Sequence, residues 1–144
     1  MMTYDNVKVG LGLVLIKDNQ VLLSQRKTDD NGTGEFGGPG GALEPGEGMK
    51  AAILRELAEE CGRGVAVENL RAICTINFRN GKSSAHWVGV GFAADYLDGA
   101  IENKEPDKHT DWEWYPLDKL PKPLYWPVAR YLEAYVSGRN FFEL

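Results

Sequence analysis

The chain contains little cysteine: only Cys61 and Cys74 occur among its 144 residues. The two do not form the closely spaced pair that binds zinc, which argues against a cysteine-based metal site. We interpret both as reduced, buried thiols, with a disulfide or a reactive thiol as the alternative.

A long hydrophobic run is also missing. The longest run, Val9–Ile16, is well short of the ~20 residues that a membrane-spanning helix needs. Residues 1–8 are polar and do not have the apolar core of a signal peptide. We therefore expect a cytoplasmic protein without membrane contact.

Positive charge is not in excess, because the formal net charge is −5. This argues against binding of DNA or RNA polymers, which requires a basic surface. A small phosphate ligand stays compatible, since a divalent cation can bridge acidic side chains to phosphate. There is no repeat, low-complexity tract or linker, and we expect residues 1–144 to form a single domain.

The sequence does contain apolar segments with the spacing of strands and helices. Strands are expected at Val7–Ile16, Gln20–Gln25, Val65–Asn77, Trp87–Tyr96 and Trp112–Pro116, the first two forming a hairpin around Asp18-Asn19. Helices are expected from Glu47 or Gly48 to near Gly62, and over Val128–Val136. Loops are expected at Thr28–Gly34, Phe36–Gly48, Arg79–Lys82 and Asp98–Asp111. This order predicts an α+β protein, with a mixed sheet sandwiched between helices.

The first helix carries three glutamates, Glu56, Glu59 and Glu60, at the spacing of helical neighbours. We expect the opposite side of the helix to be buried, with Leu54, Leu57, Ala58 and Cys61 on it. A solvated helix face is one interpretation of the glutamates. The other is a site for a hard cation such as Mg²⁺, which prefers oxygen ligands.

Glycines before this helix favour the cation site. Gly40 and Gly41 allow the backbone to approach a ligand closely, and a helix N-terminus favours phosphate oxygens. A flexible loop is the alternative for the glycines taken alone.

Together these residues form one specific pattern. Gly41, five residues, Glu47 and seven residues precede the run Arg55-Glu56-Leu57-x-Glu59-Glu60-x-Gly62. The segment resembles the Nudix box of the Nudix hydrolases, with every polar and glycine position filled.

Two positions depart from the family pattern. Arg63 stands where the family has a bulky aliphatic residue, and we expect Val65 to take over its packing. Gly38 stands where many members have a bulky apolar residue, which would open the pocket near the base.

The resemblance implies the Nudix fold and an Mg²⁺- or Mn²⁺-dependent hydrolase of a nucleoside diphosphate linked to another group. It implies that the cation is held by carboxylates and by the Gly40 carbonyl, with Gly41 in the substrate-binding loop. A box glutamate or a carboxylate from a later loop would be the base toward water. The residues implied as catalytic are Glu47, Arg55, Glu56, Glu59 and Glu60, with Glu47 paired to Arg55 and the last three as metal ligands.

The rest of the chain shows a weaker resemblance. Glu105-Pro106-Asp107-Lys108, Trp112-Glu113-Trp114 and Leu120–Pro127 resemble a subgroup of Nudix nucleoside-triphosphate diphosphatases. The subgroup includes members that act on guanine nucleotides and members that act on prenyl diphosphates. It also implies that Val128 lies beside the base and that the protein is a homodimer. The subgroup has a histidine at the position of His86 too, and we interpret this residue as structural, with contact to the ligand as the alternative.

Charged candidates outside the box have two interpretations each. Glu105 or Asp107 would close the metal site, or is a solvated loop acid. Arg26 and Lys27 would neutralise the outer phosphates of a substrate, or form an exposed pair at a strand end. We expect His109 to face solvent.

Aromatic candidates are similarly divided. Tyr125 and Trp126 would wall a base-stacking, substrate-binding pocket, or pack in the core. For Trp112 and Trp114 we expect core packing.

The favoured reaction is attack of water on a phosphorus of a nucleoside triphosphate, releasing a nucleoside monophosphate and pyrophosphate, as in sanitation of the nucleotide pool. The alternatives are hydrolysis of ADP-ribose, a sugar nucleotide, a pterin triphosphate or a prenyl diphosphate. A nucleotide-binding module without turnover is a further alternative, and the complete set of box carboxylates argues against it.

Overall fold

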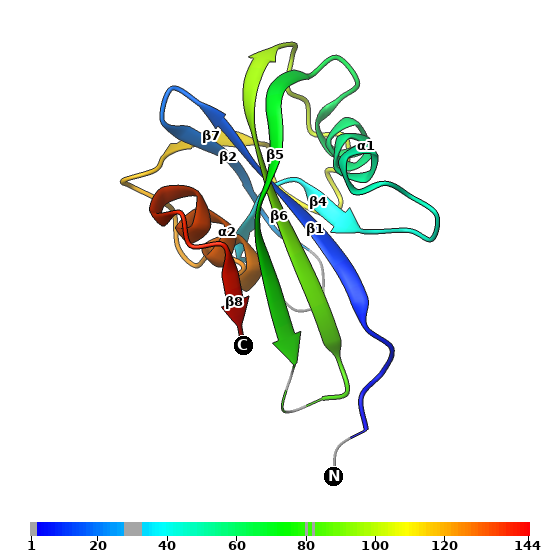
Figure 1. The fold of residues 1–144 in the computed structure, drawn as a ribbon. Coiled ribbons are helices and arrows are strands. Elements are labelled where there is room, and N and C mark those ends of the chain that lie inside the picture. Colours follow the sequence, from blue (N-terminus) through cyan, green and yellow to red (C-terminus); the bar gives the residue numbers. More distant parts are fainter. Residues whose placement is uncertain (1–2, 28–32, 80, 82) are drawn as a thin grey trace.

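The structure is a computed structural model that describes residues 3–27, 33–79, 81 and 83–144. One sheet organises this part of the chain, with a helix on each side (Figure 1). Its strands are β1 (Lys8–Lys17), β2 (Gln20–Gln25), β3 (Phe36–Gly37), β4 (Gly40–Ala42), β5 (Ala66–Arg79), β6 (His86–Asp98), β7 (Glu113–Pro116) and β8 (Phe141–Glu143), and its helices are α1 (Met49–Cys61) and α2 (Trp126–Ser137).

The predicted hairpin of β1 and β2 is confirmed. Ile16 pairs with Val21 across the turn. Asp18 and Asn19 both have positive φ, 51° and 61°, which suits the tight turns that join antiparallel strands.

The sheet is mixed, as the element order predicts. The strand order is β3-β2-β1-β6-β5-β8, with β4 paired to β1 and β7 paired to β2. β1 runs parallel to β6, whereas β5 and β6 form a long antiparallel pair with bulges. The α+β class with a sheet between helices is therefore confirmed.

Alternation along β1 divides the core into two layers. Leu11, Leu13 and Leu15 are buried on the face that packs against α1. Val14 and Ile16 are buried on the other face, against α2. Successive side chains of a strand point to opposite faces, so one apolar run serves both helices.

Several short elements were not predicted. The glycine-rich loop contains β3 and β4, the chain ends in β8, and α2 begins at Trp126 instead of Val128. Trp112 precedes β7 instead of opening it. Strands of two or three residues are set by pairing with a neighbouring strand, which no local sequence pattern records.

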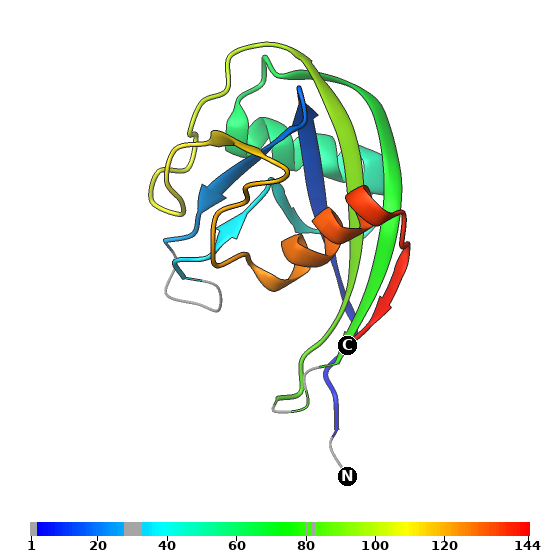
Figure 2. The ribbon, with the colours of Figure 1, turned by 90° about the vertical axis from the view of Figure 1, so that its left-hand side faces the viewer.

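Two of the predicted loops fall partly outside the described residues: 28–32 in the first, and Asn80 with Lys82 in the Asn-Gly turn. The charged segment after Asp98 has no helix and no strand up to Trp112. Figure 2 shows this segment descending beside the C-terminal end of α1.

Candidate active site

Helix α1 turns one of its three glutamates fully inward. Ile53, Leu57 and Glu60 follow the i, i+4, i+7 spacing of one stripe, so burying the two aliphatic residues also buries Glu60. The expected burial of Leu54 and Ala58 is wrong, because Leu54 is 42% exposed and Ala58 is only half-buried. The buried face is therefore rotated toward the acidic stripe, the side of α1 that carries Glu56, Glu59 and Glu60.

The end of α1 agrees with the sequence. Gly62 takes φ 112°, a conformation that favours glycine, and its N–H donates to the Ala58 carbonyl. Val65 packs against the same apolar cluster as α1, as expected from the departure at Arg63.

The glycine-rich loop lies directly against the acidic stripe. The Gly40 N–H donates to Oε1 of Glu60 at 3.3 Å. A Cβ on Gly41 would lie 2.5 Å from the carboxyl carbon of Glu56. Gly41 is thus required because the Glu56 carboxylate occupies the space of a side chain.

Burial makes these two carboxylates resist ionisation. It raises the pKa of Glu60 to about 9, and the Glu56 carboxylate adds to this effect. Burial also raises the pKa of Glu56, against the opposing effect of Arg55. Two desolvated carboxylates side by side are stabilised either by a shared proton or by a bound cation.

Arg55 joins the loop to the outer side of the acidic stripe. Its Nε and Nη2 donate to the two oxygens of Glu47 at 2.6 and 3.0 Å, so the expected pair is present. Nη1 donates to Glu56 at 2.9 Å and to Glu59 at 3.4 Å. The hydrogen bond from Arg55 lowers the pKa of Glu47 and raises that of the guanidinium, so both stay charged.

The three box glutamates differ in their surroundings. The Glu59 side chain is 53% exposed, whereas that of Glu56 is 15% exposed. Only Glu60 combines full burial with contact to the glycine loop.

The segment between β6 and β7 is tied to the end of α1. The Lys104 N–H and the Trp112 indole N–H both donate to the carbonyl oxygen of Glu60, at 3.2 and 3.1 Å. This brings Glu105 to the acidic stripe, where its carboxylate interacts with Glu60. Asp107, the other acid considered from the sequence, is exposed on the same segment.

The expectation that His109 faces solvent is wrong. The residue is 7% exposed, and its ring lies 4.7 Å from that of Trp112. Its backbone forms a β-bridge with Arg26, and the next N–H donates to Gln25. Docking of this segment onto the end of β2 buries the ring. One donor atom each of Glu60, Glu105 and His109 lies within 4.8 Å of the others.

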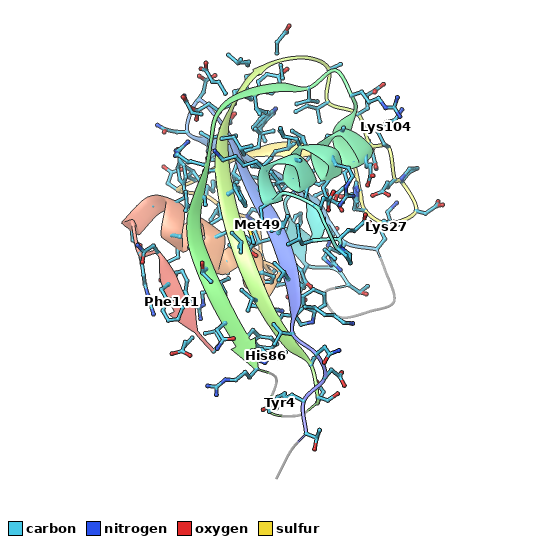
Figure 3. The ribbon with its side chains drawn as sticks, turned by 45° about the vertical axis from the view of Figure 1, so that its right-hand side comes forward. Tyr4, Lys27, Met49, His86, Lys104 and Phe141 are labelled. Carbon is cyan, nitrogen blue, oxygen red and sulfur yellow. The ribbon has the colours of Figure 1, made fainter. Side chains whose placement is uncertain are left out.

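Arg26 and Lys27 have different positions. The Arg26 guanidinium lies 4.2 Å from the centre of the Tyr125 ring, beside a cavity of about 440 Å³. The Lys27 ammonium donates to the Pro106 carbonyl at 3.2 Å, on the segment that carries Glu105. Figure 3 shows Lys27 and Lys104 on the same side of the molecule as α1.

The cavity lies between the glycine-rich loop and the start of α2. Tyr125, Trp126 and Val128 form part of its wall, and the Trp126 ring also packs 4.3 Å from Phe78. Core packing and pocket lining are therefore not alternatives for these aromatic residues. Gly38 lies in the wall, where a Cβ would meet the Leu13 carbonyl at 2.8 Å.

Sequence reasoning missed Tyr131, a further residue of the cavity wall. Its ring lies over Gly12 of β1 and over Gly89 and Gly91 of β6, where a Cβ would come within 2.7 Å of the tyrosine. Glycines at alternate positions in two strands were the available signal. They indicate a groove in the sheet that accepts a large side chain.

A second, charged hollow of about 490 Å³ borders the outer side of the acidic stripe. Arg55, Arg63 and Lys104 contribute cationic groups to its wall, with Glu59 and Glu105. His86 takes no part in either hollow: its Nε2 pairs with the side-chain oxygen of Asn77 at 2.7 Å, and neither wall includes it.

The chain is similar to known proteins of one family. Residues 7–135 match the family model of the NUDIX domain. An ADP-ribose pyrophosphatase from Methanocaldococcus jannaschii is 30% identical over 137 residues, 95% of this chain and 78% of the relative. The crystal structure of a MutT NUDIX hydrolase from Burkholderia pseudomallei has 32% identity and a TM-score of 0.82, covering 90% of this chain and 98% of the other.

A third relative is much longer than this chain. A NAD-capped RNA hydrolase, NudC, from Pseudomonas aeruginosa is 35% identical over 102 residues. The match covers 69% of this chain and 34% of the relative, so the chain spans about a third of that protein. Among the described residues, no helix is long and apolar enough to cross a membrane.

Proposed function

The chain belongs to the Nudix hydrolase family, and we propose that it cleaves nucleoside triphosphates to a nucleoside monophosphate and pyrophosphate. The observation that supports this proposal most is that the cavity and the acidic stripe share the same two loop residues. Gly40 and Gly41 border the cavity and also contact Glu60 and Glu56. A base bound in the cavity would therefore place its phosphates at the acidic stripe.

The lining of the cavity suits a flat aromatic ligand. Tyr125 and Trp126 contribute aromatic side chains to its wall, and most of the wall is apolar. Arg26 stands at the same wall with its guanidinium over Tyr125, so in this proposal it lies nearer to the base than to the outer phosphates for which the sequence suggested it. The positions of Val128 and Gly38 in the wall agree with roles near the base.

The charged hollow supports a triphosphate over a ligand with a second sugar. Arg63 and Lys104 border it beside Glu105, and cationic groups stabilise terminal phosphate oxygens. Lys108, whose ammonium lies 3.2 Å from the Glu105 carboxylate, adds another positive charge here.

The residues of the acidic stripe fit a divalent cation. Burial keeps Glu56 and Glu60 from ionising freely, which is the electrostatic situation that a cation relieves. We assign Glu56, Glu59, Glu60 and Glu105 as its carboxylate ligands, with the Gly40 carbonyl as a further one. Bound Mg²⁺ or Mn²⁺ would neutralise the charge that develops on the phosphate oxygens.

The chain itself supplies orientation and proton transfer. Arg55 holds the loop residue Glu47 to the helix, which fixes Gly41 beside Glu56. A water attacks phosphorus, the bond between the released pyrophosphate and the nucleotide breaks, and a carboxylate of the cluster accepts the proton of the water.

ADP-ribose is the second candidate substrate. The observation that favours it is the similarity to the archaeal ADP-ribose pyrophosphatase, which extends over 95% of this chain. Other diphosphates, including prenyl diphosphates, remain in the tested set because the cavity wall is largely apolar.

A substrate panel with Mg²⁺ tests the proposal. We expect pyrophosphate release from nucleoside triphosphates, including oxidised forms, and loss of this activity in Glu60→Gln. Glu68→Gln is the matched control, because Glu68 is exposed on β5. Cleavage of ADP-ribose or of a prenyl diphosphate alone would contradict the triphosphate assignment and leave the metal site standing. Light scattering on the same sample tests the predicted homodimer.

A further inference from the structure

We propose that His109, with Glu60 and Glu105, forms a nitrogen-containing site for a divalent transition-metal ion. The site lies where the segment before β7 meets the end of α1, and its three side chains each bring a donor atom within 4.8 Å of the others. The proposal shares Glu60 and Glu105 with the proposed function and rests on it only to that extent.

The hydrogen bonding of His109 fixes which ring nitrogen is available. Nδ1 lies 3.1 Å from the Thr110 carbonyl oxygen, which can only accept a hydrogen bond. In the neutral ring the proton therefore sits on Nδ1, and Nε2 carries the lone pair. Metal-binding histidines show this arrangement, in which the second ring N–H donates to a carbonyl or carboxylate.

Nε2 has no hydrogen-bond partner among the described residues, although it is buried. His109 is 7% exposed, so solvent does not replace the missing partner. A buried polar atom without a partner is rare and requires a reason. A metal ion bound between Nε2 and the two carboxylates provides one.

The position of the ring is firmly held. The His109 N–H donates to the Glu105 carbonyl at 3.3 Å, and the Asn103 amide donates to the His109 carbonyl at 2.9 Å. The ring lies against that of Trp112. His109 and Glu105 thus belong to one braced turn, which is docked on the buried Glu60 of α1.

Binding requires only a small contraction of the three donors. Ligand atoms about 2.0–2.2 Å from a metal ion lie closer together than 4.8 Å, so the carboxylates must move inward. Lys108, which holds the Glu105 carboxylate at 3.2 Å, is mostly exposed and can turn away. Glu105 is then free to rotate toward the ion.

The donor set predicts which ions are preferred. Magnesium favours all-oxygen sites, whereas an imidazole favours ions such as Co²⁺ and Zn²⁺. His109 therefore makes this position selective for transition metals. Glu56 and Glu59, the other box glutamates of α1, are not part of this set and offer oxygen donors alone.

The first test is NMR of the histidine rings in the metal-free protein. The chain has two histidines, so His86 is an internal control, and it lies near Tyr4, far from Lys104 and the α1 end (Figure 3). We expect His109 to carry its proton on Nδ1 and its Nε2 resonance to shift when Zn²⁺ is added. An unchanged His109 resonance at saturating Zn²⁺ overturns the proposal.

The second test is titration with Co²⁺ and with Mg²⁺ in the absence of substrate. We expect His109→Gln and His109→Phe, which retains a ring against Trp112, to weaken Co²⁺ binding about tenfold or more. Mg²⁺ binding should change much less, and His86→Gln should change neither. Equal Co²⁺ affinity in the His109 variants overturns the proposal, whereas failure of the substrate panel alone leaves it intact.

Discussion

The two helices cover opposite faces of one sheet, yet they are buried in different ways. α2 packs Val128, Tyr131 and Leu132 against the sheet, and this contact is hydrophobic. α1 places Ile53 and Leu57 there too, but it adds Glu60 to the buried set and Glu56 beside it. These three residues of α2 therefore carry no charge, and they also border the cavity. On the α1 side, the proposed cation would balance the buried carboxylates.

The same contrast holds for glycine. On the α2 side, Gly12, Gly89 and Gly91 make room for the ring of Tyr131. On the α1 side, Gly41 makes room for the carboxylate of Glu56. The glycines on the α2 side therefore allow a ring to pack closely on the sheet, whereas Gly41 on the α1 side allows a carboxylate to lie close to the loop.

The largest effect is expected from neutralising the buried acid of α1. Glu60→Gln should lower kcat by about a thousandfold, a barrier change of about 4 kcal/mol, because the cation loses a buried ligand. Initial rates on the preferred substrate measure it. Glu133→Gln in α2, where the carboxylate pairs with Arg130 and Arg139 at the surface, should leave the rate unchanged. Similar losses in both variants would contradict the contrast between the helices.

The second-largest effect is expected from adding a methyl group to the glycine-rich loop. Gly41→Ala should lower kcat by about a hundredfold, because the new Cβ displaces the Glu56 carboxylate. The control is Gly64→Ala, whose Cβ would meet no heavy atom within 4 Å and which lies in the wall of neither hollow. Steady-state kinetics of both variants measure the difference, and equal activity of the two would show that Glu56 tolerates the shift.

Stability should depend on pH through Glu60. Its pKa is raised from 4.5 to about 9 in the folded state, so the folded protein keeps a proton that the unfolded chain releases. This contribution to stability is present below pH 4.5 and is lost progressively as the pH rises through about 9.

We therefore expect the metal-free protein to lose on the order of 2 kcal/mol between mildly acidic and mildly alkaline pH. Thermal unfolding across this range measures it. Mg²⁺ should restore the loss at the alkaline end, and Glu60→Gln should flatten the profile. An unchanged profile in Glu60→Gln would assign the pH dependence to other groups.

The smallest effect is expected at the cavity wall. Trp126→Ala should raise KM about tenfold with little change in kcat, because the ring contributes to binding in the ground state and the transition state alike. Phe141→Ala is a matched control, since that ring is 51% exposed on β8. A drop in kcat without a change in KM would place Trp126 nearer to the reacting phosphate.

Local sequence patterns were sufficient for much of the fold. The β1–β2 hairpin, the limits of α1 and the mixed sheet follow from apolar periodicity, turn residues and Gly62 as a helix end. The pairing of Glu47 with Arg55 came from the family resemblance and is present in the structure. The short strands β3, β4 and β8 could not be predicted, because distant pairing partners define them.

The glycine-rich loop and the carboxylates at helical spacing are properties of consecutive residues, so the sequence was enough to predict them as a candidate site. The surroundings of those residues depended on how distant segments pack. The tertiary structure buried Glu60 instead of Leu54, and it brought Glu105 and His109 from a segment far along the chain to the end of α1. The physical reason is that burial and carboxylate pKa depend on which segments pack together, and helical spacing fixes only neighbours within one helix.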